Sequence, residues 1–349
     1  MRHILLGVAP LSIFFVFLWS SGWIGSKYGL GYAGTFSLLT WRYALVVLVL
    51  LVLVTAFKAW RKMSWPVVAG HLLVGILSHA VYLSTSLSAM DLGVSVGMVA
   101  FVLALQPMLT AVISAPLTGE ATSLRQWTGL VLGLLAVLVV VGDRLSLGGS
   151  PFAYSLLLVS TFGITLGSLI CRRMELTAQT NHQAEMPILL MLLIHCTGAL
   201  LYLIPTAAYF EGYEVEWVPS FIFSITYLGL VISLGAYGLM FVLLGKMSAT
   251  KVSSLLYLSP AATMIIAYFA FGEQLTLIDM IGLALAGIAV WIVSNEGISK
   301  PVKLEEFDFS TVSSIENEEV VRKNRPEQIA QGDVTVIRNP RFDNERLVH

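Results

Sequence analysis

Long apolar stretches separated by short polar segments fill residues 4–294 of the chain. There are ten, at residues 4–25, 35–57, 66–88, 94–116, 124–142, 152–171, 187–209, 219–243, 252–271 and 277–294. Each has about 20 residues, which is enough to cross about 30 Å of hydrocarbon as a helix. None alternates apolar and polar positions with a period of two, so membrane-spanning β-strands are excluded. We therefore predict an all-α polytopic membrane protein with ten transmembrane helices.

The composition agrees with a bilayer as the solvent. The chain is 57% hydrophobic and 12% charged, whereas a soluble domain is about 45–50% apolar and about 25% charged. The N-terminal run MRHILLGVAPLSIFFVFLW continues to Trp23 without a convincing cleavage site, which favours a retained first helix over a signal peptide. We expect an integral, multi-pass protein of a bacterial inner membrane or a plasma membrane.

Basic residues between the stretches predict the orientation. With the N-terminus inside, nine basic residues lie on the cytoplasmic side and two on the outer side, namely Arg2, Lys58, Arg61, Lys62, Arg125, Arg172, Arg173, Lys246 and Lys251 against Lys27 and Arg144. Because Lys and Arg accumulate on the cytoplasmic side, both termini are predicted to be cytoplasmic. Residues 296–349 are polar and charged and are expected to form a largely disordered tail, whose run GDVTVIRNP is a candidate strand for binding a partner protein.

Two regions repeat one pattern at a fixed distance. LALQPMLTAVISAPLTGE contains Pro107 and Glu120, LYLSPAATMIIAYFAFGE contains Pro260 and Glu273, and 153 residues separate each pair of counterparts. Five predicted helices fall within this distance. Because each helix crosses the membrane once and five is odd, the second copy has the opposite orientation in the membrane. Inverted repeats are typical of secondary transporters, in which the substrate site lies near the midplane between the halves. We expect one five-helix repeat at 1–145 and a second, inverted one at 146–295.

The same residues carry a resemblance to a known family. FLWSSGWIGSKYGL at 17–30 resembles the first helix of the EamA family within the drug/metabolite transporter superfamily, and LTWRYALVVLVL resembles its second helix. The proline, Gly-Glu and glycine-rich helix of LSPAATMIIAYFAFGEQLTLIDMIGLALAGIAVWIV are similar to the closing helices of that family, and the first half repeats them. The resemblance covers residues of about 5–295 and implies a ten-helix transporter of small organic metabolites that works by alternating access.

Polar and aromatic side chains inside the apolar stretches are the candidates for a substrate cavity. A polar group in hydrocarbon is costly unless it faces the bundle interior or water. His79, Tyr82 and Ser86 recur at helical spacing and predict a cavity wall. The alternative for such residues is packing or hydrogen bonding between helices. The full set of predicted cavity residues is Trp19, Ser20, Ser21, Trp23, His79, Tyr82, Ser86, Gln106, Thr161, Thr165, Tyr237, Ser254, Tyr257 and Ser259.

A second set is predicted to shape or gate this cavity. Pro107 and Pro260 each remove a backbone donor and free a carbonyl one turn earlier, which predicts kinks inside their helices. Arg42 lies roughly 10 Å into its stretch at 1.5 Å per residue. From there it either snorkels to the outer interface or pairs with Glu273. Glu120 and Glu273 follow glycines at stretch ends, where they serve helix-end structure or a gating ion pair.

Missing residue types limit the chemistry. No acidic residue lies near the middle of a stretch, so a carboxylate proton relay is not expected. Transport is then either uncoupled or exchange-like, or His79 carries the coupling proton. No Arg or Lys is placed at the midplane, which favours a neutral or zwitterionic, partly apolar metabolite over a strongly anionic one. Phosphate-loop and metal-ligand spacings are absent from the sequence, so we expect no ATPase, metal or cofactor, and no nucleic-acid partner.

We therefore expect a carrier or facilitator, not an enzyme, that exports a small metabolite such as an amino acid. Two alternatives remain at the level of the sequence. A membrane sensor or scaffold would act through residues 296–349. An intramembrane enzyme would use His79 with Tyr82, or His195.

Overall fold

The computed structural model describes residues 2–94, 99, 102–141, 150–181, 186–259, 262, 265–266 and 277–295. It does not describe the side chains of 2–9, 23, 24, 27, 28, 140, 141 and 279. The described helices belong to one compact unit, Met1–Lys303, while the second unit, Leu304–His349, lies outside the described residues.

The described part of the chain is helical, with one isolated antiparallel bridge between Ala33 and Val215. In the first half the elements are α1 (Arg2–Leu30), α2 (Thr35–Ala56), α3 (Trp65–Gly75), η1 (Ile76–Val81), α4 (Tyr82–Asp91), α6 (Gln106–Thr118) and α7 (Leu124–Val141). In the second half they are α8 (Pro151–Thr180), α9 (Ile188–Phe210), α10 (Pro219–Thr226), η3 (Tyr227–Ala236), α11 (Tyr237–Lys246), α12 (Ala249–Ser254), η4 (Leu255–Leu258) and α14 (Leu277–Ser294).

Five of the described helical rods are long and apolar enough to cross a membrane. They are Thr35–Ala56, Trp65–Asp91, Pro151–Thr180, Ile188–Phe210 and Pro219–Lys246. Shorter apolar helices occupy Pro10–Gly22, Leu124–Val139 and Met280–Ser294. The predicted stretches 94–116 and 252–271 fall partly on residues that are not described.

Local sequence accounts for where these helices begin and end. Ser150 accepts a hydrogen bond from the Ala153 backbone N–H, and Pro151 follows it in the first turn of α8. Gly119 ends α6 in the left-handed conformation, with φ of 73°. The N-terminus of α2 is capped from a distant segment, because the Glu211 carboxylate accepts the backbone N–H groups of Phe36 and Ser37.

Two rods contain the same irregularity. The rods Trp65–Asp91 and Pro219–Lys246 turn π-helical in their middle, over η1 and η3. Displaced by 153 residues, η1 would cover 229–234, which falls inside η3. A π-helical turn changes the face that a helix presents and is frequent at functional sites.

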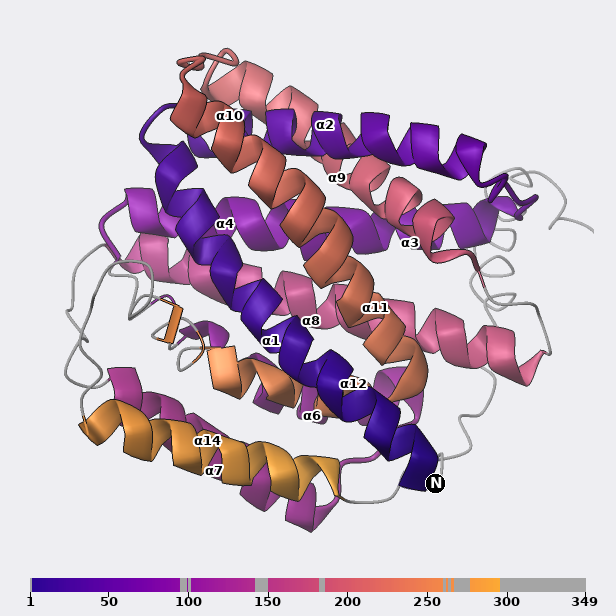
Figure 1. The fold of residues 1–349 in the computed structure, drawn as a ribbon, viewed down its shortest axis with the longest axis vertical. Coiled ribbons are helices and arrows are strands. Elements are labelled where there is room, and N and C mark those ends of the chain that lie inside the picture. The colour runs from indigo at the N-terminus through magenta and orange to yellow at the C-terminus, as the bar shows by residue number, and fades with distance from the viewer. Residues whose placement is uncertain are drawn as a thin grey trace, which may run out of the picture. The chain divides into compact units, whose positions relative to one another are not determined.

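Helix packing has the same internal correspondence. α2 packs on α9 and α7 on α14, and each of these pairs joins counterparts that lie about 153 residues apart (Figure 1). α8 packs on α3, η1 and α4, just as α1 packs on α10, η3 and α11. The contact pattern is therefore preserved when each element is exchanged for its counterpart.

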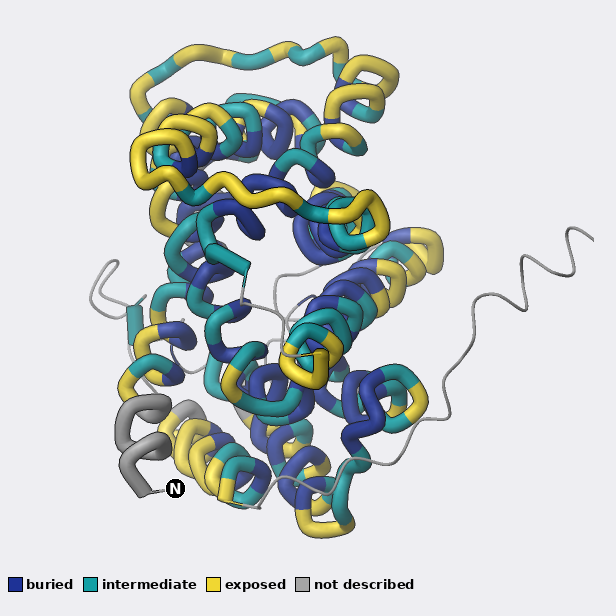
Figure 2. Tube along the Cα trace, turned by 90° about the vertical axis from the view of Figure 1, so that its right-hand side faces the viewer, coloured by how far each residue is buried: buried dark blue, intermediate teal, exposed yellow. Residues whose placement is uncertain are grey.

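Burial divides each helix into two faces, as Figure 2 shows. Large apolar side chains such as Leu48, Val52, Leu135 and Phe162 are exposed, which suits contact with lipid. Inside the bundle, small residues allow neighbouring helices to approach each other closely. A Cβ on Gly198 of α9 would collide with the Leu72 carbonyl of α3.

Candidate functional site

A small cavity lies between elements of the two halves. Its volume is about 30 Å³, which is room for about two water molecules. α1, α2 and α4 form one side, and η3 and α11 form the other. The lining residues are Trp19, Gly22, Ser26, Arg42, Tyr82, Leu83, Leu87, Leu228, Ile232 and Tyr237.

Three aromatic rings from three helices form one wall of this cavity. The Trp19 ring centroid lies 4.8 Å from that of Tyr237 and 6.2 Å from that of Tyr82. The Tyr237 hydroxyl donates a hydrogen bond of 3.0 Å to the Ser78 carbonyl in η1. That carbonyl belongs to the π-helical turn, so the irregular backbone takes part in positioning the ring.

Arg42 brings a positive charge into the cavity. Its side chain is 2% exposed, its Nε donates to Ser233 Oγ over 3.0 Å, and its guanidinium lies 5.2 Å from the centre of the Tyr43 ring. Nη2 has no hydrogen-bond partner among the described residues. The expectation that Arg42 snorkels to the outer interface is wrong, because η3 and the Tyr43 ring draw the side chain into the bundle. Glu273, its other expected partner, lies outside the described residues.

Histidines gather beside the cavity. His79 Nδ1 lies 3.1 Å from the Tyr43 hydroxyl, and its ring stacks on Tyr237 at 4.0 Å between centroids. The His195 ring lies 6.0 Å from the His79 ring, and its Nε2 lies 2.9 Å from His71 Nδ1. His79 Nε2 and His195 Nδ1 have no partner within the described part of the chain. Three imidazoles thus line up through the bundle, although the described residues hold no group of three His, Cys, Asp or Glu placed to bind a metal ion.

A second, smaller space lies further along the bundle. Its volume is about 10 Å³, and its lining includes Gln106 of α6, Ser168 of α8, Leu244 of α11 and Ser253 of α12. Gln106 is thus buried beside a different space from the one lined by Trp19 and Tyr82.

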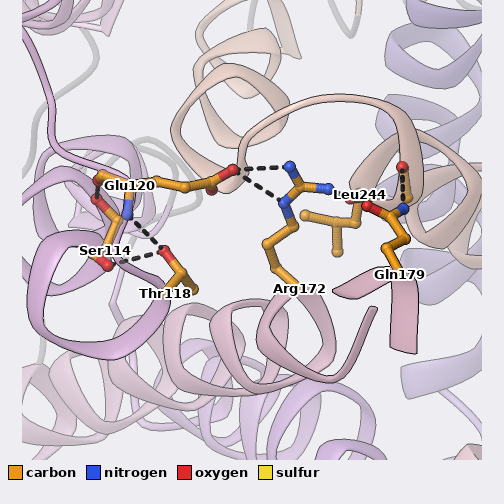
Figure 3. A network of polar contacts seen from close by, with 7 residues as sticks. Ser114, Thr118, Glu120, Arg172, Gln179 and Leu244 are labelled. Atoms are coloured by element: carbon orange, nitrogen blue, oxygen red, sulfur yellow. Dashed lines mark hydrogen bonds and ion pairs between the residues drawn. The ribbon is translucent and has the colours of Figure 1, made fainter. Parts of the chain in front are cut away.

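An ion pair lies next to this second space (Figure 3). Arg172 of α8 donates from Nη2 and Nε to Glu120 Oε1, over 2.7 Å and 3.2 Å, and from Nη1 to the Leu244 carbonyl over 2.7 Å. The Glu120 backbone is held by Ser114, whose hydroxyl donates to the Glu120 carbonyl over 2.9 Å. Three segments of the chain therefore meet at Arg172: the turn after α6, α8, and the end of α11.

The predicted end of the sixth stretch, at residue 171, is corrected by this finding. α8 continues to Thr180, nine residues further. Arg172 is therefore a buried helical residue and not part of a loop.

Several predicted cavity residues bond elsewhere, because a small hydroxyl on a helix readily reaches a backbone carbonyl one turn back. Ser86 donates to the Tyr82 carbonyl over 2.7 Å and contacts Ser160 of α8 over 2.6 Å, so it joins two helices. Ser20 donates to the Val16 carbonyl and contacts Ser259 Oγ over 2.9 Å. Back-bonding also holds Ser21, Thr161 and Ser254, to the carbonyls of Leu18, Leu157 and Lys251. None of these residues lines either space.

The remaining predicted residues have other surroundings. Tyr257 is buried with Leu130 and Val293 in a separate apolar cluster, and its ring packs close to Gly133 of α7. Thr165 is buried in α8 and its hydroxyl has no partner among the described residues. Pro260 and the side chain of Trp23 lie outside the described residues.

Pro107 does not kink the interior of a helix. It lies in the first turn of α6, directly after a turn at Ala104 and Leu105 that interrupts the fourth apolar stretch. At this position a missing backbone N–H costs little, because the first turn has no intrahelical acceptor for it. The predicted break in the helix exists, but it precedes the proline.

Sequence reasoning missed several residues of the site. It did not pair His71 with His195, Arg42 with Ser233 or Glu120 with Arg172, because each pair joins distant helices. The helical spacing of polar residues beyond residue 171, at Arg172, Glu175 and Gln179, was a signal that α8 continues.

Comparison with known proteins places this geometry in a family. The chain is 25% identical over 292 residues to "Uncharacterized transporter YvbV" of Bacillus subtilis (strain 168), covering 82% of this chain and 92% of that protein. It is 26% identical over 297 residues to the "Probable amino-acid metabolite efflux pump" of Escherichia coli (strain K12), covering 81% of this chain and 93% of that protein. A crystal structure superimposes with a TM-score of 0.67 at 18% identity, covers 82% of this chain and 97% of that chain, and shows the shared fold.

Residues 7–142 and 151–295 each match the model of the EamA-like transporter family. These two matches include the cavity and the ion pair. The chain therefore belongs to the EamA-like transporter family and is an integral, multi-pass membrane transporter.

Proposed function

We propose that this transporter is a secondary carrier or facilitator that exports a small neutral or zwitterionic metabolite, amino acids included, by alternating access. The observation that carries the proposal is the buried cavity between the two halves, with Trp19, Arg42 and Tyr82 on one side and Ile232 and Tyr237 on the other. A site at such a junction opens to either side when the halves rock against each other. The printed name of the Escherichia coli relative supports export and amino-acid metabolites.

The proposal includes ten helices in two inverted repeats, 1–145 and 146–295, with both termini and residues 296–349 in the cytoplasm. The packing of α2 on α9 and of α7 on α14, counterparts that lie 153 residues apart, supports the repeats. The distribution of Lys and Arg between the apolar stretches supports the orientation.

In this orientation the two spaces lie at different depths. The cavity around Arg42 lies toward the outside, because Ser26 of α1 and Leu87 of α4 lie near the ends of their helices that are predicted to be outer. The ion pair of Glu120 with Arg172 lies at the cytoplasmic end. We assign it the role of a cytoplasmic gate that is closed in this conformation. The same orientation puts Glu273, the counterpart of Glu120 in the second repeat, on the outer side.

The volume of about 30 Å³ is too small for an amino acid, since ligand pockets span roughly 300–1,000 Å³. Substrate therefore enters after the halves separate. His79 is the proposed carrier of a coupling proton, because it stands beside the cavity and connects through His195 to His71.

The test is uptake into proteoliposomes of the purified full chain, with labelled amino acids and other neutral metabolites, with and without a pH gradient. Saturable uptake supports the proposal, and dependence on the gradient makes the protein proton-coupled. Absence of uptake for every compound, from protein shown to be folded, refutes the transport proposal. In that case the sensor acting through residues 296–349 and the intramembrane enzyme become the hypotheses to test.

A further inference from the structure

Arg42 is a buried charge without a buried counter-charge. The described residues give its guanidinium the Ser233 hydroxyl and the Tyr43 ring but no carboxylate. A cation inside a membrane protein is expensive unless it is paired or solvated. Nη2, which is buried and unpartnered on a residue that lines the cavity, is therefore free to receive an acceptor from a ligand.

Acidic residues of the described part of the chain are engaged by other groups. Asp91 accepts a hydrogen bond of 2.6 Å from Thr35, and both oxygens of Glu211 accept backbone N–H groups of the first turn of α2. Glu120 pairs with Arg172. Among the described residues, these acids thus have other partners, and none of them pairs with Arg42.

The other lining residues of the cavity indicate which kind of ligand would carry the acceptor group for Arg42. Trp19, Tyr82 and Tyr237 present ring surfaces, and Leu83, Leu228 and Ile232 present aliphatic ones. Such a lining favours an apolar or aromatic body. A planar guanidinium matches a carboxylate with two hydrogen bonds, which a neutral amide cannot reproduce as strongly.

We infer that the transported substrate carries a carboxylate that binds the Arg42 guanidinium, attached to an aromatic or apolar body that packs on Trp19, Tyr82 and Tyr237. This inference rests on the proposed transport function. Within that function it selects zwitterionic amino acids, and it adds organic monocarboxylate anions to the substrate class. The sequence placed no Arg or Lys at the midplane and therefore favoured substrates without a net negative charge. Arg42 at the cavity changes that expectation. Metabolites without a carboxylate would leave Arg42 unpaired and are poor substrates.

The experiment compares matched compounds in proteoliposomes of the full chain. L-Phenylalanine and 3-phenylpropanoate carry the carboxylate, while phenylalaninamide and phenethylamine keep the ring and lack it. The uptake of labelled phenylalanine is measured against each unlabelled competitor. In the wild type we expect the carboxylates to compete at concentrations at least about tenfold lower than the compounds without one.

Two substitutions at Arg42 and one matched control isolate the charge. Arg42→Gln removes the charge and is expected to abolish the preference for carboxylates, whereas Arg42→Lys keeps the charge and part of the preference. Arg125→Gln removes an exposed positive charge that lines neither space and is expected to retain the preference. A purely structural role of Arg42 would change the amount of folded protein and the rate without changing the ratio between carboxylate and amide.

The outcomes separate the inference from the proposed function. Transport with equal competition by acids and amides, or an unchanged preference in Arg42→Gln, overturns the inference and leaves the transport function standing. If no compound is transported, the unfolding temperature of the protein, measured with and without 3-phenylpropanoate, shows whether the ligand binds. Stabilisation of the wild type, but not of Arg42→Gln, by 3-phenylpropanoate then supports the Arg42 site, and no difference between the two overturns it.

Discussion

Glu120→Gln tests the proposed cytoplasmic gate directly. The change removes the negative charge that holds Arg172 and keeps the size and an acceptor oxygen of the side chain. In the structure, Glu120 Oε1 receives Arg172 Nη2 at 2.7 Å and Nε at 3.2 Å, while Arg172 Nη1 binds the Leu244 carbonyl. The substitution therefore loosens one of the two connections that converge on Arg172.

The size of the effect follows from the burial of the pair. The side chains are 6% and 11% exposed, so water screens the attraction weakly. A hydrogen bond to a charged group is worth about 1.5–3 kcal/mol, and this connection exists in the closed state alone. Its loss should shift the equilibrium toward the inward-open state by roughly 10- to 150-fold.

A cysteine at Ser253 provides the measurement. Ser253 lines the small space next to Leu244 and is buried, so it should become reachable from the cytoplasm when the gate opens. The native cysteines, Cys171 and Cys196, are buried and are replaced by serine to leave one reactive thiol. The rate of modification by a membrane-impermeant maleimide from the cytoplasmic side is expected to rise at least about tenfold in Glu120→Gln.

Glu214→Gln is the matched control, because Glu214 is exposed and its charge change breaks no buried pair. It is expected to leave the labelling rate of Ser253→Cys unchanged. An unchanged rate in Glu120→Gln, from protein that folds as well as the control, would refute the gate. An equal rise in both variants would refute it as well, because that result would reflect net charge alone.

Three further predictions concern coupling, packing and the tail. His79→Ala should abolish accumulation driven by a pH gradient while exchange of substrate across the membrane persists, and gradient-driven accumulation that survives the change contradicts a proton role for His79. Gly198→Ala should lower stability by about 1–3 kcal/mol, seen as a lower unfolding temperature, because its Cβ would collide with the Leu72 carbonyl. Gly287→Ala, which meets nothing within 4 Å, is its control. Deletion of residues 296–349 should leave uptake intact, and loss of function by that deletion would favour the sensor hypothesis.

Hydropathy was sufficient to locate most helices. The expected stretches 35–57 and 277–294 correspond to Thr35–Ala56 and Leu277–Ser294. Hydropathy did not locate the end of a helix that continues into polar sequence. α8 runs nine residues beyond residue 171, and its Arg172 is buried in the bundle. The bilayer determines the apolar length, whereas hydrogen bonding and packing determine where the helix ends.

The direction of side chains was harder to predict than their depth. The sequence put His79 and Tyr82 on one face, and both lie at or beside the cavity. Ser86 was expected on that face too, but its hydroxyl donates a hydrogen bond to the Tyr82 carbonyl and contacts the Ser160 hydroxyl. Arg42 turns inward because Ser233, from the other half, gives its Nε a partner. Such partners come from residues far away along the chain, and one sequence does not identify them.

The irregular backbone shows how the repeat relates to movement. π-helical turns occur at η1 and η3, and breaks occur at Ala104–Leu105 and at η4, which a shift of 153 residues brings into correspondence. Backbone that departs from the α-helix in a membrane is tolerated where it is buried in protein or lines water. Packing accidents would not recur at equivalent places in two halves that differ in sequence. The recurrence therefore supports a use of these turns in the proposed alternating access, and Leu228 and Ile232 of η3 line the cavity. α7 and α14, in contrast, pack on each other, are regular α-helices in their described part, and line neither the cavity nor the second space.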